Sequence, residues 1–135
     1  MEMKATLKWV DNMQIVARSG NGPAIIMDNI ERGSGPTPMQ LLLMGVAGCT
    51  AMDVVSIMKK KRAGMTGLEV NISGERAEDH PKRYTKINME FVFTGNAIKP
   101  KDAERSIELS ITKYCSAVAS LNATVEHTYH IVEKD

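Results

Sequence analysis

The longest apolar stretch of the chain runs from Thr37 to Arg62 and predicts a single helix. Thr37 is suited to the N-cap and forms a capping-box pattern with Gln40, while Pro38 occupies the first helical position, where its missing N–H costs nothing. The cations at 59–62 complement the negative end of the helix dipole, and Gly64 follows as a stop. A helix of about 26 residues is a rod of roughly 39 Å.

The middle of this predicted helix has no polar stripe. From Leu41 to Ala47 the only residue that is not apolar is Gly45, and apolar residues continue to Met58. Such a helix must be enclosed on all sides. A membrane span is the competing interpretation, but the uncharged run ends at Asp53, short of the ~20 residues that a bilayer needs. We therefore expect no membrane partner and a helix buried in a protein assembly, with a partner subunit helping to cover it.

Alternating patterns before the helix predict three short strands. Apolar and polar residues alternate over 4–10 and 13–19, and a third short strand is expected over 24–28. Turn residues separate the segments, and the glycine, serine and proline of 29–36 predict a loop. The N-terminal part should be an antiparallel three-stranded meander.

The second half continues with strands and a shorter helix. Residues 68–73 and 83–94 alternate, and 74–82 is either a solvated extension of the first of these strands or a loop. A helix opens at Pro100 and is expected to run to Val118, with a possible break near Tyr114 and Cys115, before a last strand over 124–132. Strands and helices are segregated in this order, which predicts one α+β domain spanning 1–135.

Composition narrows the function. The formal net charge is +1, so there is no electrostatic case for nucleic acid. The first nine residues carry Glu2, Lys4 and Lys8 and lack the apolar core of a signal peptide, which favours the cytoplasm. In that reducing compartment the two cysteines are expected to be free, catalytic or redox-active rather than a structural disulfide.

Cys49 is the first candidate for chemistry. It lies in the middle of the long predicted helix, where Gly45 and Gly48 leave a notch beside the sulfur. A buried cysteine often serves only as a small apolar side chain, and that interpretation stays open here. A thiol in the middle of a helix also gains nothing from a helix N-terminus, so its thiolate needs a hydrogen-bond donor or a cation from another element.

Cys115 is the second candidate, because helical periodicity places it on the apolar face of the second helix. Two buried cysteines could be neighbours, and such a pair fits a peroxidatic thiol that becomes a sulfenic acid and a resolving thiol that closes a disulfide. Two unrelated core cysteines would give the same spacing.

The sequence predicts no metal site and no cofactor. His127 and His130 lie three apart on a predicted strand and so point to opposite faces, and His80 lies in a polar stretch. There is no C-x-x-C pair, and the glycine-rich and nucleophile motifs of nucleotide-binding proteins and hydrolases are missing from the sequence.

The segment TPMQLLLMGVAGCTAMDVVSIMKKKR resembles the central helix of the OsmC/Ohr proteins, with a proline before the helix, leucines and small residues, and a cysteine at its middle. TKYCSAV resembles the second cysteine segment of that family, and the order of strands and helices also matches. The closest likeness is to a poorly characterised OsmC-like branch.

The resemblance implies an α+β homodimer with interleaved subunits, antiparallel sheets around a long buried central helix, and active sites at the dimer interface. It also implies a cysteine-based peroxidase that reduces organic hydroperoxides in oxidative-stress defence. Cys49 would be the peroxidatic thiol and Cys115 the resolving thiol, with a dithiol as reductant. Leu43, Met44 and Met52 would supply apolar walls for a small apolar hydroperoxide.

One departure from the family pattern favours an alternative. The active peroxidases carry a glutamate ten residues before the first cysteine, paired with an arginine that stabilises the thiolate, whereas Met39 occupies that position here. Arg18 and Arg32 are the nearest candidates for the arginine, although surface solvation suits both better. The alternative is a non-enzymatic dimer that binds small apolar or electrophilic molecules in the Cys49 pocket, and a third interpretation is a structural dimer with inert core cysteines.

Overall fold

The computed structural model describes residues 1–134, which form an α+β fold with two small sheets and one long helix. The chain divides into two compact units, Met1–Leu42 and the residues from Leu43 onward. Each unit contains one three-stranded sheet, and the long helix α1 begins in the first unit and continues through the second.

The first unit is the predicted meander. Strands β1 (Ala5–Asp11), β2 (Gln14–Ser19) and β3 (Ala24–Met27) pair antiparallel in the order β1-β2-β3. The following loop is organised by Asp28, whose carboxylate accepts hydrogen bonds from the backbone N–H groups of Asn29 and Ser34 and from the Ser34 hydroxyl. The Ser34 hydroxyl is the main reason that the pKa of Asp28 lies below its ordinary value.

Helix α1 spans Pro38–Lys60, close to its predicted bounds. The capping box is confirmed: the Gln40 backbone N–H donates to Thr37 Oγ1 over 3.1 Å, and Gln40 Oε1 accepts from the Thr37 N–H over 2.9 Å. The chain leaves the helix through Gly64, which adopts a positive φ of 81°. A Cβ there would lie 2.2 Å from the Asn96 carbonyl oxygen, so only glycine fits this exit.

The described chain covers only one stripe of α1. The buried residues follow each other at intervals of four and lie on one face of the helix: Val46, Thr50, Val54 and Met58. Met44 and Met52 on other faces are 52% and 76% exposed. By length and composition alone α1 could cross a membrane, with a mean hydropathy of 1.9. Apolar side chains on the other faces of α1 thus remain exposed, and the partner subunit expected from the sequence stays a prediction.

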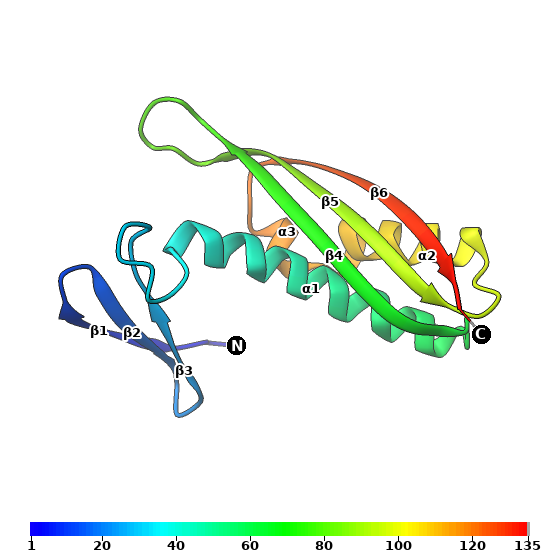
Figure 1. Cartoon of the computed structure of the whole chain (residues 1–135), viewed down its shortest axis with the longest axis horizontal. Helices are drawn as coiled ribbons and strands as arrows, with labels where there is room; N and C mark the ends of the chain where they lie inside the picture. Colours follow the sequence, from blue (N-terminus) through cyan, green and yellow to red (C-terminus); the bar gives the residue numbers. More distant parts are fainter. Residues whose placement is uncertain (135) are drawn as a thin grey trace. The chain divides into compact units, whose positions relative to one another are not determined.

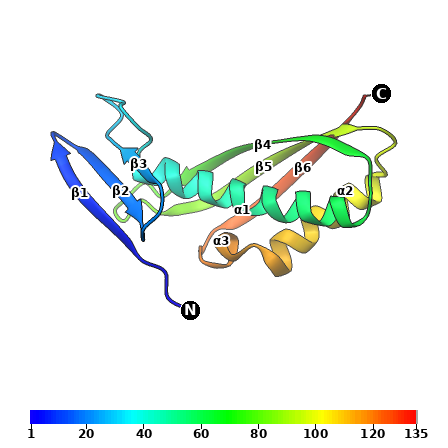
Figure 2. The ribbon, with the colours of Figure 1, turned by 90° about the horizontal axis from the view of Figure 1, so that it is seen from below.

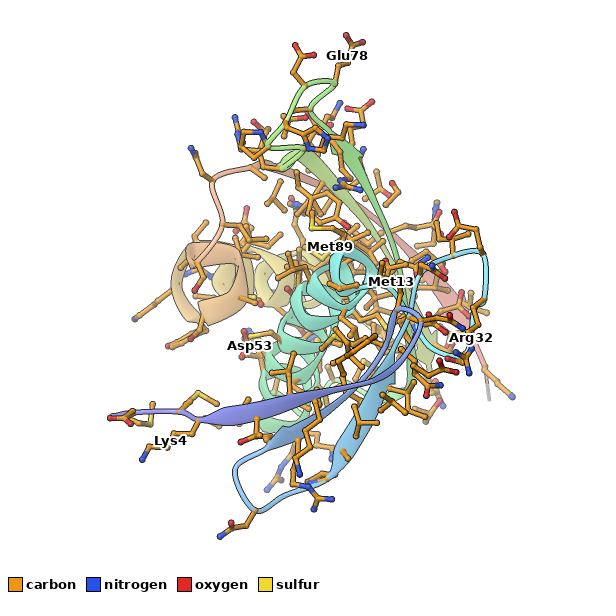
Figure 3. All side chains as sticks on the ribbon, turned by 90° about the vertical axis from the view of Figure 1, so that its left-hand side faces the viewer. Lys4, Met13, Arg32, Asp53, Glu78 and Met89 are labelled. Carbon is orange, nitrogen blue, oxygen red and sulfur yellow. The ribbon has the colours of Figure 1, made fainter. Side chains whose placement is uncertain are left out.

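The second unit contains a sheet with β5 at its centre. Strand β4 (Met65–Arg76) pairs with β5 (Tyr84–Gly95) antiparallel, and β6 (Thr124–Glu133) pairs with β5 in parallel (Figure 1). The family resemblance implied antiparallel sheets, and β6 differs because it follows a helical crossover, the kind of connection that parallel strands need. The polar stretch after residue 73 is in part the predicted extension of β4, and Glu78 lies at the tip of the loop that follows (Figure 3).

The core lies between this sheet and the helices. Every second residue along β5 is buried on the face that α1 and α2 cover (Figure 2): Ile87, Met89, Phe91 and Phe93. The rings of Phe91 and Phe93 stack with centroids 6.4 Å apart. The opposite face of the sheet is polar, and there Asn71 donates to both Glu69 and Glu90.

The second predicted helix is broken where the sequence suggested. Helix α2 spans Pro100–Leu109, a π-helical turn η1 spans Ser110–Tyr114, and the short helix α3 spans Ser116–Ala119. The break falls at Cys115, whose extended backbone separates η1 from α3. Single π-helical turns are frequent at functional sites.

Candidate functional site

Helix α1 places Cys49 at the edge of its buried stripe. Its side chain is half-buried, while the next residue, Thr50, is completely buried. A Cβ added at Gly45 or Gly48 would meet no atom within 4 Å, so the space beside Cys49 along the helix surface is open. The predicted notch is therefore present, and a small molecule can approach this sulfur.

The break after η1 places Cys115 against α1. Its side chain is 3% exposed, and its sulfur lies 3.3 Å from Thr50 Oγ1. The backbone N–H of Val118 donates to the same sulfur over 3.4 Å, so Cys115 also caps α3. The Cys115 thiol is therefore in hydrogen-bonding contact with Thr50 of α1 and with the first turn of α3.

The two thiols lie together with one carboxylate. The sulfurs of Cys49 and Cys115 and a carboxylate oxygen of Asp53 all lie within 4.8 Å of one another. Asp53 is one helical turn after Cys49 on the same face of α1 and is labelled on that helix in Figure 3. The Ser110 hydroxyl donates to Asp53 Oδ2 over 2.8 Å and fixes the carboxylate toward the pair. A disulfide needs the sulfurs about 2.0 Å apart, so the two side chains would have to move toward each other to form one.

Burial dominates the ionisation of Cys115. It raises the pKa of the Cys115 thiol above its ordinary value, and neighbouring Cys49 raises it further, while the hydrogen bonds from Thr50 and Val118 act in the opposite direction. The less buried thiol, Cys49, is therefore the better placed of the two to meet a reagent from solution.

Thr50 has one hydroxyl proton and two partners. Its Oγ1 lies 3.0 Å from the Val46 carbonyl and 3.3 Å from the Cys115 sulfur. When Cys115 is a thiol, the hydroxyl can donate to Val46 and accept the S–H proton; when Cys115 is a thiolate, the hydroxyl can turn and donate to the sulfur. Thr50 thus serves both ionisation states of Cys115.

A Thr50→Val variant is therefore expected to raise the pKa of Cys115 further. Valine keeps the shape of threonine but cannot donate to the thiolate. The measurement is the thiolate ultraviolet absorbance against pH in a Cys49→Ser background, so that one thiol titrates. Thr66→Val is the matched control, because Thr66 is exposed and its hydroxyl donates to Thr94. An unchanged titration curve in Thr50→Val would contradict the role given to this hydroxyl.

A hollow of about 380 Å³ opens beside Asp53. Its walls combine apolar side chains with the two lysines at the end of α1, and its lining comprises Asp53, Ser56, Ile57, Lys60, Lys61, Leu109 and Tyr114. This lining differs from the apolar walls expected from the sequence, since Met44 and Met52 are exposed on the helix surface. Neither cysteine is among these lining residues, and the hollow is linked to the thiol pair through Asp53, whose carboxylate lies within 4.8 Å of both sulfurs.

The remaining candidate residues lie in other surroundings. Arg32 is paired with Asp11 over 3.3 Å and with Asp28 over 3.8 Å, all within the first unit. Arg18 is exposed on β2, as surface solvation predicts. His127 and His130 are both exposed on β6, and His130 Nε2 lies 3.4 Å from Glu90. These histidines are sheet residues, as their spacing indicated.

The sequence predicted the two thiols and places Asp53 on the same helical face as Cys49, but it did not predict the roles of the polar partners. Asp53 carried a signal, because its i,i+4 spacing from Cys49 puts both on one face of a helix. Ser110 and Thr50 carried none, since their roles depend on how η1 packs on α1.

A long helix packed on a three-stranded sheet, with two thiols meeting at the point where the second helix breaks, defines a dithiol protein of the α+β class. The chain belongs to the OsmC-like protein family, whose model matches residues 31–130.

Relatives support this membership. Protein YhfA of Escherichia coli K12 is 38% identical over 132 residues, which cover 96% of this chain and 98% of that protein. The fold is similar to an OsmC-like protein from Mycoplasma pneumoniae, with a TM-score of 0.85, 17% identity and 98% coverage of both chains. It is also similar to the organic hydroperoxide resistance protein OhrB of Bacillus subtilis, with a TM-score of 0.65, 15% identity and coverage of 96% and 98%.

Proposed function

We propose that this protein is a dithiol peroxidase that reduces organic hydroperoxides and so serves oxidative-stress defence. The observation that carries the proposal is the placement of the Cys49 and Cys115 sulfurs within 4.8 Å of each other, one accessible and one buried. Family membership and the fold shared with an organic hydroperoxide resistance protein support it.

The proposed reaction has three steps. The Cys49 sulfur attacks the distal peroxide oxygen, the O–O bond breaks, and the products are a Cys49 sulfenic acid and, after protonation, an alcohol. The Cys115 thiol then attacks the sulfenic sulfur, forming the disulfide and releasing water. An external dithiol reduces the disulfide and is itself oxidised to a cyclic or linear disulfide.

Asp53 is the group proposed to handle the proton. A carboxylate oxygen of Asp53 lies within 4.8 Å of both sulfurs, near enough to take a proton directly or through one water. Removal of the Cys49 proton is then coupled to attack on the peroxide, with Asp53 accepting the proton and returning it to the leaving alkoxide. The Ser110 hydroxyl holds the carboxylate for this task. Asp53 would thus act as the base in a chain that has Met39 at the position of the family's glutamate.

The proposal also covers where the substrate binds, which surface forms a dimer contact and in which compartment the protein works. The hollow beside Asp53 has Ile57, Leu109 and Tyr114 in its walls and would hold the organic part of the hydroperoxide. The uncovered apolar faces of α1 are proposed to be the contact surface of a homodimer. Two free thiols suit a reducing compartment, and we place the protein in the cytoplasm.

The test is a single-turnover oxidation. Reduced protein is mixed with one equivalent of cumene hydroperoxide, and in parallel with hydrogen peroxide, and free thiols are counted against time. The expected result is loss of both thiols, faster with the organic peroxide, and a Cys49–Cys115 link in the peptide map. If both cysteines stay reduced after excess organic hydroperoxide, the peroxidase proposal is wrong.

One observation favours a second candidate, a non-enzymatic binder of small apolar or electrophilic molecules. Met39 stands at the position of the glutamate that, in the peroxidases that the sequence resembles, pairs with the thiolate-stabilising arginine. Such a binder would hold the molecule in the hollow lined by Asp53, with Cys49, one helical turn before Asp53 on α1, as the proposed contact or covalent acceptor. In the single-turnover experiment it would keep both thiols reduced, while an electrophile such as N-ethylmaleimide would label Cys49 ahead of Cys115.

A further inference from the structure

We infer that Cys49, Asp53 and Cys115 form a binding site for a thiophilic divalent cation of the zinc class. The three side chains come from two elements that converge, α1 and the Cys115 break between η1 and α3, and their ligand atoms lie within 4.8 Å of one another. The proposal departs from the sequence-based prediction of no metal site, which rested on the spacing of the histidines and the lack of a C-x-x-C pair. The binding requires only these side chains and does not rest on the proposed peroxidase activity.

The distances suit a tetrahedral ion. Zinc binds sulfur at about 2.3 Å and carboxylate oxygen at about 2.0–2.2 Å, so neighbouring ligand atoms of a tetrahedral site lie roughly 3.4–3.8 Å apart. The three atoms here lie no more than 4.8 Å apart, so any pair would have to close by at most about 1.4 Å around the ion. Cys49 and Asp53 are only half-buried, so solvent can reach the fourth position.

The donor types select the metal. Two thiolates and one carboxylate suit zinc and its softer analogue cadmium, while magnesium and calcium prefer sites made of oxygen alone. Binding displaces one proton from each thiol, and the ion with two thiolates and one carboxylate then carries a net charge of −1. That charge is far smaller than the −3 that the three ligands would carry alone.

The polar groups around the three ligands are those that metal sites use. The Ser110 hydroxyl donates to Asp53 Oδ2 over 2.8 Å, and the Val118 N–H donates to the Cys115 sulfur over 3.4 Å. Thr50 Oγ1 lies 3.3 Å from that sulfur. Outer hydrogen bonds of this kind orient the ligands and tune the affinity for the ion.

The metal and the disulfide exclude each other. Both use the same two sulfurs, so an occupied site holds Cys49 and Cys115 as separate thiolates and an oxidised pair cannot bind the ion. The site thus has a reduced form that accepts metal and an oxidised form that rejects it.

The experiment titrates the full chain, stripped of metal and kept reduced with a phosphine, with cadmium and in parallel with zinc. The expected result is saturable binding of one cadmium per chain with a thiolate-to-cadmium charge-transfer band, and zinc competing for the same site. Cys49→Ser and Cys115→Ser should each lose the band. Ser110→Ala, which keeps all three ligands, should weaken binding on the order of 10-fold.

The control is Asp79→Asn, which removes a carboxylate from the exposed loop after β4 and should leave the titration unchanged. Circular dichroism melting of each variant establishes that it is folded. The inference is overturned if cadmium gives no saturable charge-transfer band, or if the band persists in both cysteine variants. Peroxide is not used, so a failed peroxidase test leaves this result intact.

Discussion

A Cys49→Ser variant is expected to lose turnover of organic hydroperoxide by more than about 1,000-fold, the scale on which enzymes fail without their nucleophile. The hydroxyl of serine does not attack peroxide oxygen, and the remaining thiol, Cys115, is 3% exposed and has a raised pKa. The measurement is consumption of cumene hydroperoxide with a dithiol as reductant. If the variant keeps its turnover, Cys49 is not the nucleophile.

Cys115→Ser separates attack from resolution. Oxidation of Cys49 should proceed, but the sulfenic acid should persist, because the buried sulfur that closes the disulfide is missing. Trapping with a dione and mapping by mass should find the adduct on Cys49 alone. The chain has two cysteines, so the thiol count falls by one in this variant and by two in the parent.

The control for both variants is Ser120→Ala, which removes an exposed hydroxyl from the end of α3 while both thiols remain. It should react like the parent. If Cys115→Ser shows no oxidation at all, the two cysteines do not act as nucleophile and resolving thiol, and the binder becomes the better hypothesis.

Local signals in the sequence predicted most of the elements. The capping box of α1 is satisfied within four residues, so the start of the helix could be located from Thr37 and Gln40. The alternating face of β5 was likewise visible, because Phe91 and Phe93 repeat at the spacing of a strand. These features depend on neighbours in the chain, and the structure confirms them.

Features that depend on contacts between residues far apart in the chain were harder to predict from the sequence. The parallel register of β6 against β5 follows from the crossover through α2 and α3, and the alternation of β6 is the same for either direction. The 65 residues between Cys49 and Cys115 hide their proximity, since it depends on the π-helical turn at Ser110 and on the hydrogen bond from Ser110 to Asp53. Periodicity places each thiol on a face, but only packing brings the two faces together.

Met52→Glu is expected to prevent self-association of the chain. Met52 is 76% exposed on α1, where Leu42 and Met44 are exposed as well, and in the proposed homodimer it lies in the contact. A charge without a partner in such an interface costs on the order of 3 kcal/mol or more. A two-fold interface contains the substitution twice. Association should weaken by more than about 100-fold.

Sedimentation velocity at micromolar concentration without detergent provides the measurement. The parent should sediment as a dimer and Met52→Glu as a monomer. Met3→Glu makes the same substitution at an exposed methionine before β1 and should remain a dimer. If Met52→Glu is still a dimer, this face of α1 does not form the dimer contact. A parent that is monomeric in buffer and binds lipid vesicles would instead assign the apolar surface of α1 to a membrane. Because α1 also carries Cys49, the partner or membrane that contacts the apolar surface of α1 would lie next to the proposed active site.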